Sequence, residues 1–119
     1  MERWNQYDAG LQDLKTAGKI DLPTVPAGCK HNAHMYYIKC RDIAERTALT
    51  AFLKQREINA VFHYIPLHSA AAGRRFGRFH GEDRYTTRES ERLLRLPMYY
   101  GLTAEDCDTV IRALHEFYA

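Results

Sequence analysis

The chain has 119 residues, of which 45% are hydrophobic and 27% charged, and its net charge is +2 at pH 7. This balance is typical of one globular domain with its own core, and so small a charge gives no argument for a nucleic-acid or membrane partner. No apolar run reaches the length of a transmembrane helix. The three cysteines have unrelated spacings, so we expect reduced thiols in a cytoplasmic protein: Cys29, Cys40 and Cys107.

The first predicted element is a helix from residue 2 to about residue 17. Its apolar residues follow the spacing of one helical face: Trp4, Tyr7, Leu11 and Leu14. Gly18 is a suitable C-terminal stop. Because no capping residue precedes the helix, we expect it to continue upstream in a longer chain. We also expect part of its apolar face to be open when that longer chain is missing.

Residues 19–34 form a predicted connector, because Pro23, Pro26 and Gly28 interrupt any regular element. This connector and the strand after it contain sulfur and imidazole groups of the kind that bind zinc: Cys29, His31, His34 and Cys40. Their spacing matches no closed zinc site, and the chain has no Cys-x-x-Cys pair. We therefore interpret them as residues that flank a strand, and we expect no metal.

A strand is predicted over residues 35–40, where apolar side chains alternate with others: Tyr36, Ile38 and Cys40. Asp42 and Glu45 form a capping box that begins the next helix. This helix extends to about residue 56 and turns an apolar side toward the core: Leu49, Phe52 and Leu53. A second strand is predicted over residues 58–63, and its β-branched and aromatic residues favour that assignment.

The stretch from Asn59 to His68 joins this strand to a rigid loop, because Pro66 fixes its own φ and favours extended backbone before it. Three titratable side chains lie where the strand ends: His63, Tyr64 and His68. Polar side chains on a stiff loop are well placed to contact a ligand. The pattern alone equally allows these groups to be satisfied core residues.

Residues 67–84 are predicted to be irregular, with a short helical turn near Ala70–Gly73. Basic and aromatic residues alternate with glycine here: Arg74, Arg75, Phe76, Arg78, Phe79 and Arg84. Such a segment can hold a phosphate or stack on a base. The alternative is a solvated loop that its two phenylalanines attach to the core. Long irregular segments in compact domains usually have a function, so we expect a mobile functional loop.

Thr86 and Glu89 form a second predicted capping box, for a helix that carries Leu93 and Leu94 and ends before Pro97. A short third strand is predicted at about 95–98, at an edge of the sheet because proline cannot donate to a ladder. Thr103 caps the last helix, whose apolar stripe is expected to be core: Cys107, Val110, Ile111, Leu114 and Phe117. The predicted class is α+β, with three mostly antiparallel strands and helices on one face.

This order of motifs resembles the C-terminal domain of the sugar aminotransferases of the DegT/DnrJ/EryC1/StrS family. The main likeness lies in His63-Tyr64-Ile65-Pro66-Leu67-His68 and, later, in Leu96-Pro97-Met98-Tyr99 with Leu102-Thr103. His34-Met35-Tyr36-Tyr37-Ile38 and the opening helix also fit, so the resemblance covers nearly the whole chain. Residues 79–87 and 89–97 carry a closer likeness within the family.

The resemblance implies an enzyme of the aspartate-aminotransferase fold that uses pyridoxal phosphate. Such an enzyme moves an amino group from glutamate to the 4-keto carbon of a nucleotide-linked 6-deoxy sugar. Residues 1–119 would then be one small C-terminal domain, with 1–18 as the interdomain helix. Its partners would be a large cofactor-binding domain of the same chain and a second copy in a homodimer.

In the family, the Schiff-base lysine, the acid that binds the pyridinium nitrogen and the phosphate loop belong to the large domain. The lysines of this chain match none of these motifs: Lys15, Lys19, Lys30, Lys39 and Lys54. The resemblance therefore implies a C-terminal fragment, roughly the last third of an enzyme. We expect it to be inactive alone and to hold no cofactor, with no catalytic and no metal-binding residue.

By motif position, the resemblance assigns His63 and Tyr64 to the substrate and extends that assignment to His68. Imidazole and phenol groups can hydrogen-bond sugar hydroxyls or pyrophosphate oxygens, and a tyrosine ring can stack on a sugar or a base. A stand-alone nucleic-acid-binding module is the main alternative, through the basic and aromatic residues of 67–84. The nearly balanced charge and the lack of a Gly-aromatic strand pattern disfavour it.

Overall fold

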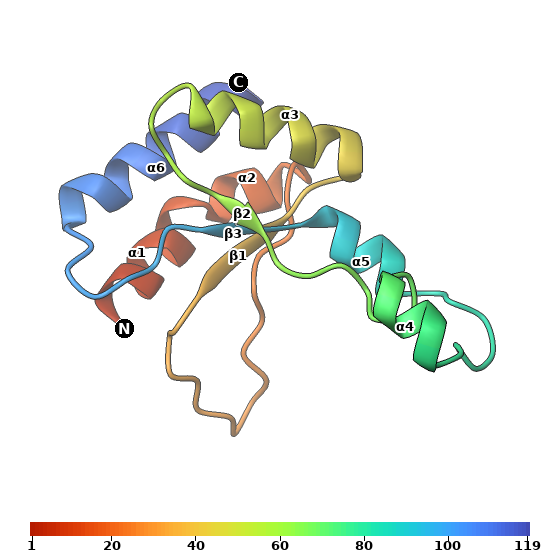
Figure 1. Ribbon diagram of the computed structural model, residues 1–119. Helices are drawn as coiled ribbons and strands as arrows, with labels where there is room; N and C mark the ends of the chain where they lie inside the picture. The colour runs from red at the N-terminus through yellow and green to blue at the C-terminus, as the bar shows by residue number, and fades with distance from the viewer.

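The computed structural model describes all residues 1–119 and contains one antiparallel sheet of three strands, with helices packed against it (Figure 1). The elements are α1 (Glu2–Gly10), α2 (Gln12–Thr16), β1 (Tyr36–Lys39), α3 (Ile43–Lys54), β2 (Val61–Phe62), α4 (Ala71–Phe76), α5 (Thr86–Arg92), β3 (Leu93–Leu96) and α6 (Ala104–Tyr118). The predicted α+β class is confirmed. None of the helices is both long and apolar enough to span a membrane.

The strand order is β1-β3-β2, so the last strand in the sequence lies in the centre of the sheet. Tyr36 pairs with Leu96 and Ile38 with Leu94, and these residues are buried on one face. The residues between them face the other side and are half-buried, as in the pair of Tyr37 with Arg95. The period-two pattern predicted for the first strand is therefore confirmed.

The predicted position of the third strand is wrong in two respects. Leu93 and Leu94 belong to β3 and not to the preceding helix, and β3 is the central strand and not an edge. The physical reason is that Pro97 lies just beyond the last ladder residue, Leu96. Its missing N–H therefore costs no hydrogen bond within the sheet, and the argument for an edge does not apply.

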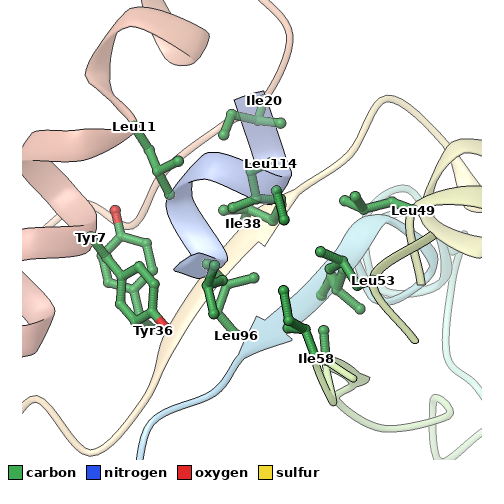
Figure 2. Close-up of a cluster of buried hydrophobic side chains, with 14 of the residues drawn as sticks. Tyr7, Leu11, Ile20, Tyr36, Ile38, Leu49, Leu53, Ile58, Leu96 and Leu114 are labelled. Atoms are coloured by element: carbon green, nitrogen blue, oxygen red, sulfur yellow. The ribbon is translucent and has the colours of Figure 1, made fainter. Parts of the chain in front are cut away.

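The core lies between the buried face of the sheet and the helices α1, α3 and α6 (Figure 2). The stripe of α6 contributes to it as predicted, with Val110 and Leu114 buried and Ile111 half-buried against the core. Stacked rings of Tyr7 and Tyr36, with centroids 5.2 Å apart, join α1 to β1. The Tyr7 hydroxyl donates to the Pro97 carbonyl at 3.0 Å, which fixes the chain as it leaves β3.

The predicted first helix is interrupted at Leu11, which divides it into α1 and α2. Its apolar face is closed within the chain: Tyr7 and Leu11 are fully buried, Leu14 is 7% exposed, and Trp4 is half-buried. The expectation of an open face is therefore wrong for most of this helix. The reason is α6, which lies alongside α1 and covers it (Figure 1).

Two of the predicted helix caps are confirmed. The Asp42 carboxylate accepts from the Glu45 N–H at 2.9 Å and begins α3, and the Thr103 hydroxyl accepts from the Asp106 N–H at 3.0 Å and begins α6. The third is wrong, because Thr86 makes no capping bond.

The segment from Val61 to Leu93 contains no buried residue. The second strand is only two residues long, shorter than predicted, and both residues are exposed at the edge of the sheet. Beyond β2 the chain runs away from the helices of the core to α4 and α5 (Figure 1). Its apolar side chains are largely exposed: Tyr64 70%, Ile65 63%, Leu67 77% and Phe76 79%.

Candidate functional site

The predicted site begins directly after β2. The rings of His63 and Tyr64 pack edge to face, with centroids 4.4 Å apart. Tyr64 is 70% exposed, while His63 is half-buried and its Nδ1 has no hydrogen-bond partner. The tyrosine ring is therefore accessible, and the histidine ring is held by packing and not by polar contacts.

The backbone of Tyr64 is fastened to α5, because the Ser90 hydroxyl donates to the Tyr64 carbonyl. Tyr64 and Ser90 also line a shallow pocket of about 290 Å³ with Arg46, whose guanidinium carbon lies 5.6 Å from the centre of the Phe62 ring. This pocket combines an aromatic wall with one cation, Arg46, and one acid, Glu91. Such a lining suits a ligand that has a flat or apolar part beside a group that the arginine can bind.

His68 lies in a second cluster. Its Nε2 is 2.9 Å from an Asp83 carboxylate oxygen, and its ring packs on Phe79 with centroids 4.5 Å apart. Thr87 donates to the same carboxylate through its hydroxyl at 2.5 Å, and its N–H lies 3.3 Å from it. The bonds from Thr87 and the nearby His68 hold the pKa of Asp83 below its usual range, so this carboxylate stays ionised.

A groove of about 530 Å³ adjoins this second cluster. It lies between Leu67–His68 and α4, and its lining includes two aromatic residues, Phe76 and Phe79. Gly73 allows α4 to approach this closely, because a Cβ at this position would lie 1.6 Å from the Leu67 carbonyl oxygen. The three predicted site residues thus do not share one cavity: Tyr64 lines the smaller pocket and His68 the larger groove.

The basic segment of residues 67–84 is partly helical, since α4 occupies Ala71–Phe76. The Arg74 guanidinium donates to the Ser69 carbonyl at 2.8 Å, Arg75 lies 5.0 Å from the Phe76 ring centre, and Arg84 pairs with Glu82 at 3.0 Å. The side chains of Arg84 and Glu82 are both more than two-thirds exposed, so this pair adds little stability. The two phenylalanines are not buried in the core, contrary to the solvated-loop alternative.

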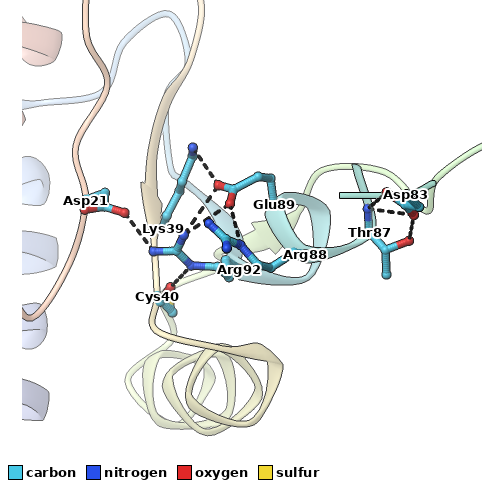
Figure 3. Close-up of polar contacts among 8 residues, drawn as sticks. All are labelled: Asp21, Lys39, Cys40, Asp83, Thr87, Arg88, Glu89 and Arg92. Atoms are coloured by element: carbon cyan, nitrogen blue, oxygen red, sulfur yellow. Dashed lines mark hydrogen bonds and ion pairs between the residues drawn. The ribbon is translucent and has the colours of Figure 1, made fainter. Parts of the chain in front are cut away.

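On the open face of the sheet, Glu89 of α5 is the centre of a charge network (Figure 3). Its carboxylate lies 2.8 Å from Lys39 Nζ, 3.0 Å from Arg88 and 3.3 Å from Arg92. Lys39 chiefly, with the two arginines, lowers the pKa of Glu89 to about 2. Arg92 extends the network to Asp21 at 2.7 Å and donates to the Cys40 carbonyl at 2.7 Å.

The lysines of this chain do not fit a Schiff-base site for pyridoxal phosphate. A lysine in that role needs a neutral amine in a pocket that also holds the cofactor. Lys39 instead forms an ion pair with Glu89 at 2.8 Å, and the other four are exposed: Lys15, Lys19, Lys30 and Lys54.

The cysteine and histidine residues weighed for zinc are not gathered into any cluster that could hold a metal ion. His31 packs against Trp4 with ring centroids 4.4 Å apart, whereas Cys40 is fully buried. Burial raises the pKa of the Cys40 thiol to about 11, so it stays protonated at neutral pH. The structure thus gives these residues separate structural surroundings.

Sequence reasoning missed the residues that fasten the site, which are Asp83 just before α5 and Thr87 and Ser90 within it. A partial signal for Asp83 was present, because an aspartate near the start of a helix can accept from the N–H groups of its first turn, as Asp83 does from Thr87. The spacing of Thr86 and Glu89 suggested a competing capping box, and Glu89 is used instead by Lys39. Nothing local in the sequence pairs Ser90 with Tyr64, 26 residues away.

Comparison with known proteins gives one consistent result. The sequence profile of the DegT/DnrJ/EryC1/StrS aminotransferase family matches residues 1–115. The aminotransferase TlmJ from Streptoalloteichus hindustanus is similar in structure, with 27% identity and a TM-score of 0.80. A DegT DnrJ EryC1 StrS aminotransferase from Brucella abortus is also similar, with 25% identity and a TM-score of 0.73.

NtdA from Bacillus subtilis, whose structure has the cofactor PMP bound, shares the fold at 22% identity and a TM-score of 0.79. The first two similarities each cover 98% of this chain but only 30% of the other chain. The third covers 97% of this chain and 26% of NtdA. The chain thus spans less than a third of the length of the aminotransferases that it matches.

Proposed function

The chain belongs to the DegT/DnrJ/EryC1/StrS aminotransferase family, and we propose that it is the small C-terminal domain of a pyridoxal-phosphate-dependent sugar aminotransferase. The complete enzyme would transfer an amino group from glutamate to the 4-keto carbon of a dTDP-linked 6-deoxy sugar. The observation that carries this proposal is the family match over residues 1–115, together with the fold shared over 98% of the chain with TlmJ.

We propose that the cofactor is bound by a large domain of the same chain, because the lysines present here do not fit its site. The chain would be a single domain, with residues 1–18 as the helix that connects it to the large domain. Alone it would be inactive. The enzyme would act in the cytoplasm, in keeping with its three unpaired thiols. It would form a homodimer.

In this proposal His63 and Tyr64 contact the sugar nucleotide. Tyr64 offers an exposed ring and hydroxyl beside Arg46, which suits a ligand with a sugar or base face and a phosphate. His68 contributes an imidazole one short loop further on, at the edge of the larger groove. No residue of the chain is proposed to carry out a catalytic step.

The finer substrate assignment rests on the likeness carried by residues 79–87 and 89–97. It suggests dTDP-4-amino-4,6-dideoxygalactose transaminase, an enzyme that supplies enterobacterial common antigen, a cell-surface polysaccharide. The site itself is compatible with a diphosphate, since Arg74, Arg75 and Arg78 have no carboxylate partner. We propose the dTDP sugar as the first substrate to test.

The test uses the complete enzyme, loaded with pyridoxal phosphate and supplied with glutamate. We expect amination of dTDP-4-keto-6-deoxyglucose, measured as the amino sugar formed by mass spectrometry. A matched reaction with the UDP-linked keto sugar tests the choice of nucleotide. Amination of neither sugar, with glutamate still converting the cofactor, would refute the substrate assignment. Absence of both half-reactions would refute the aminotransferase itself.

A further inference from the structure

Asp83 connects the predicted ligand residue His68 to α5. Both contacts use the same oxygen, with His68 Nε2 at 2.9 Å and the Thr87 hydroxyl at 2.5 Å. The side chains of His68 and Asp83 are only 22% and 21% exposed, although they lie in a segment that has no buried residue. This pair is therefore better shielded than the arginines and aromatic residues around it.

The geometry gives the two nitrogens of His68 different tasks. Nε2 is used by Asp83, and the Phe79 ring packs on the imidazole at 4.5 Å, so the ring plane is fixed from two directions. Nδ1 makes no hydrogen bond within the chain. A ring fixed in this way presents one free nitrogen in a set direction, and such preorganisation reduces the entropy lost when a ligand binds.

Because Asp83 contacts His68 and not the groove itself, we propose that Asp83 is the positioning residue of His68. It holds the imidazole so that Nδ1 faces the sugar-nucleotide substrate. This inference rests on the proposed function, because it takes His68 as a substrate contact. Thr87 supports the arrangement by holding the Asp83 carboxylate. Thr87 of α5 thus acts on the ligand through Asp83 and then His68.

The same contacts have a second consequence for the chain. His68 and Asp83 are the first and last residues around the segment Ser69–Glu82, which includes α4. Their pairing closes the base of this segment, which is also held by the Phe79 ring on His68, by the bonds of Ser69 to Pro66 and by the approach of Gly73 to Leu67. Substitution of Asp83 therefore releases the imidazole and loosens the segment together.

A purely structural role for Asp83, as a cap of α5, predicts a different response. A cap acts on helix stability regardless of the residue at position 68, whereas a positioning residue has no effect on binding once His68 is gone. The double-mutant cycle of His68→Ala and Asp83→Ala in the complete enzyme separates the two roles. Glu82→Ala is the matched control, since Glu82 is the neighbouring acid and pairs only with exposed Arg84.

We expect His68→Ala to lower kcat/KM for the keto sugar about three- to a hundredfold. Asp83→Ala alone is expected to lower it about three- to tenfold, and less than about twofold in the His68→Ala background. The glutamate half-reaction and the Glu82→Ala control should stay unchanged. Independent effects that multiply in the double variant would overturn the positioning role and leave the proposed function intact.

A second measurement does not depend on activity. In the nuclear Overhauser spectrum of the 119-residue chain, the His68 ring protons should show cross-peaks to the Phe79 ring. Asp83→Ala should remove them, and Asp83→Asn, which keeps a good capping side chain, should weaken them. Unchanged cross-peaks in Asp83→Ala would overturn the inference. Lost cross-peaks, with no kinetic effect of His68→Ala, would instead refute the role of His68 in the proposed function and the inference with it.

Discussion

Two regions of this molecule are stabilised in different ways. The rest of the chain, residues 1–60 and 94–119, contains all 20 buried residues, and every one of them is hydrophobic. The segment from Val61 to Leu93 contains none. Its shape depends instead on α5, which binds the Tyr64 carbonyl through Ser90 and the Asp83–His68 pair through Thr87.

The difference teaches that stability and the candidate site are kept apart in the chain. A core of close-packed side chains tolerates little change, whereas exposed residues on a polar framework can change with small effects on folding. If stability and the site are separate, folding and function should respond to substitutions at different residues.

The largest expected effect is in the core. Leu94→Ala removes a fully buried side chain from the central strand and should lower the free energy of unfolding by about 2–5 kcal/mol. Leu67→Ala, the same change at a residue that is 77% exposed, should stay within about 0.5 kcal/mol. Urea denaturation followed by circular dichroism measures both. Equal losses would show that the segment is part of the folding core.

The second prediction concerns function in the complete enzyme. Tyr64→Phe and His63→Ala should each lower kcat/KM for the keto sugar about three- to a hundredfold, because each loses a hydrogen bond to a neutral or a charged substrate group. The glutamate half-reaction should change little, because the cofactor chemistry belongs to the proposed large domain. Stopped-flow spectra follow each half-reaction separately. A parallel fall in both would show that His63 and Tyr64 are structural.

The third prediction concerns how much the ion pairs of Glu89 in α5 stabilise the fold at different pH values. Its folded-state pKa lies below the usual 4.5, at about 2, so its ion pairs stabilise the fold above about pH 4.5. That stabilisation is lost as the pH falls from about 4.5 to 2. Because Glu89 is 26% exposed, we expect Glu89→Gln to cost about 1 kcal/mol at pH 7 and to flatten the acid side of the stability curve.

The control for this experiment is Glu82→Gln, which removes a carboxylate paired only with the exposed Arg84. Denaturation midpoints measured between about pH 2 and pH 7 should show little change for this variant. A Glu89→Gln protein with the same pH profile as the unaltered chain would contradict a stabilising role for the ion pairs of Glu89.

The smallest expected effect is the response to the cofactor itself. The isolated chain should form no stoichiometric adduct with pyridoxal phosphate, since Lys39 is paired with Glu89 and the remaining lysines are exposed. Borohydride reduction followed by peptide mass spectrometry detects such adducts. Scattered, substoichiometric labelling agrees with the proposal. Complete labelling of one lysine would contradict the assignment of the cofactor site to another domain.

Most of the fold could be predicted from local patterns. The alternation in β1, the stripe of α6 and the caps Asp42 and Thr103 are each decided by residues close in sequence. The path from α5 into β3 could not be predicted this way. Leu93 and Leu94 suit a helix as well as a strand, and only pairing with β1 and β2 on both sides decides between the two.

The candidate site was predictable in its residues but not in its arrangement. The sequence indicates His63, Tyr64 and His68, since they follow a strand and flank Pro66. It does not indicate that Tyr64 and His68 belong to separate depressions, or that Asp83 faces His68 across a sequence separation of 15. Such contacts depend on the path of the exposed segment between His68 and Asp83, and no local sequence pattern specifies that path.

The junction between α5 and β3 has a mechanical consequence. The helix ends at Arg92 and the central strand begins at Leu93, with no loop between them. Because no flexible loop separates the two elements, a ligand that displaces α5 at Thr87 or Ser90 should also displace the central strand. Amide protons of β3 and of the last turn of α5 should therefore exchange with solvent as one unit. The direct junction thus couples the motion of α5 to that of the central strand.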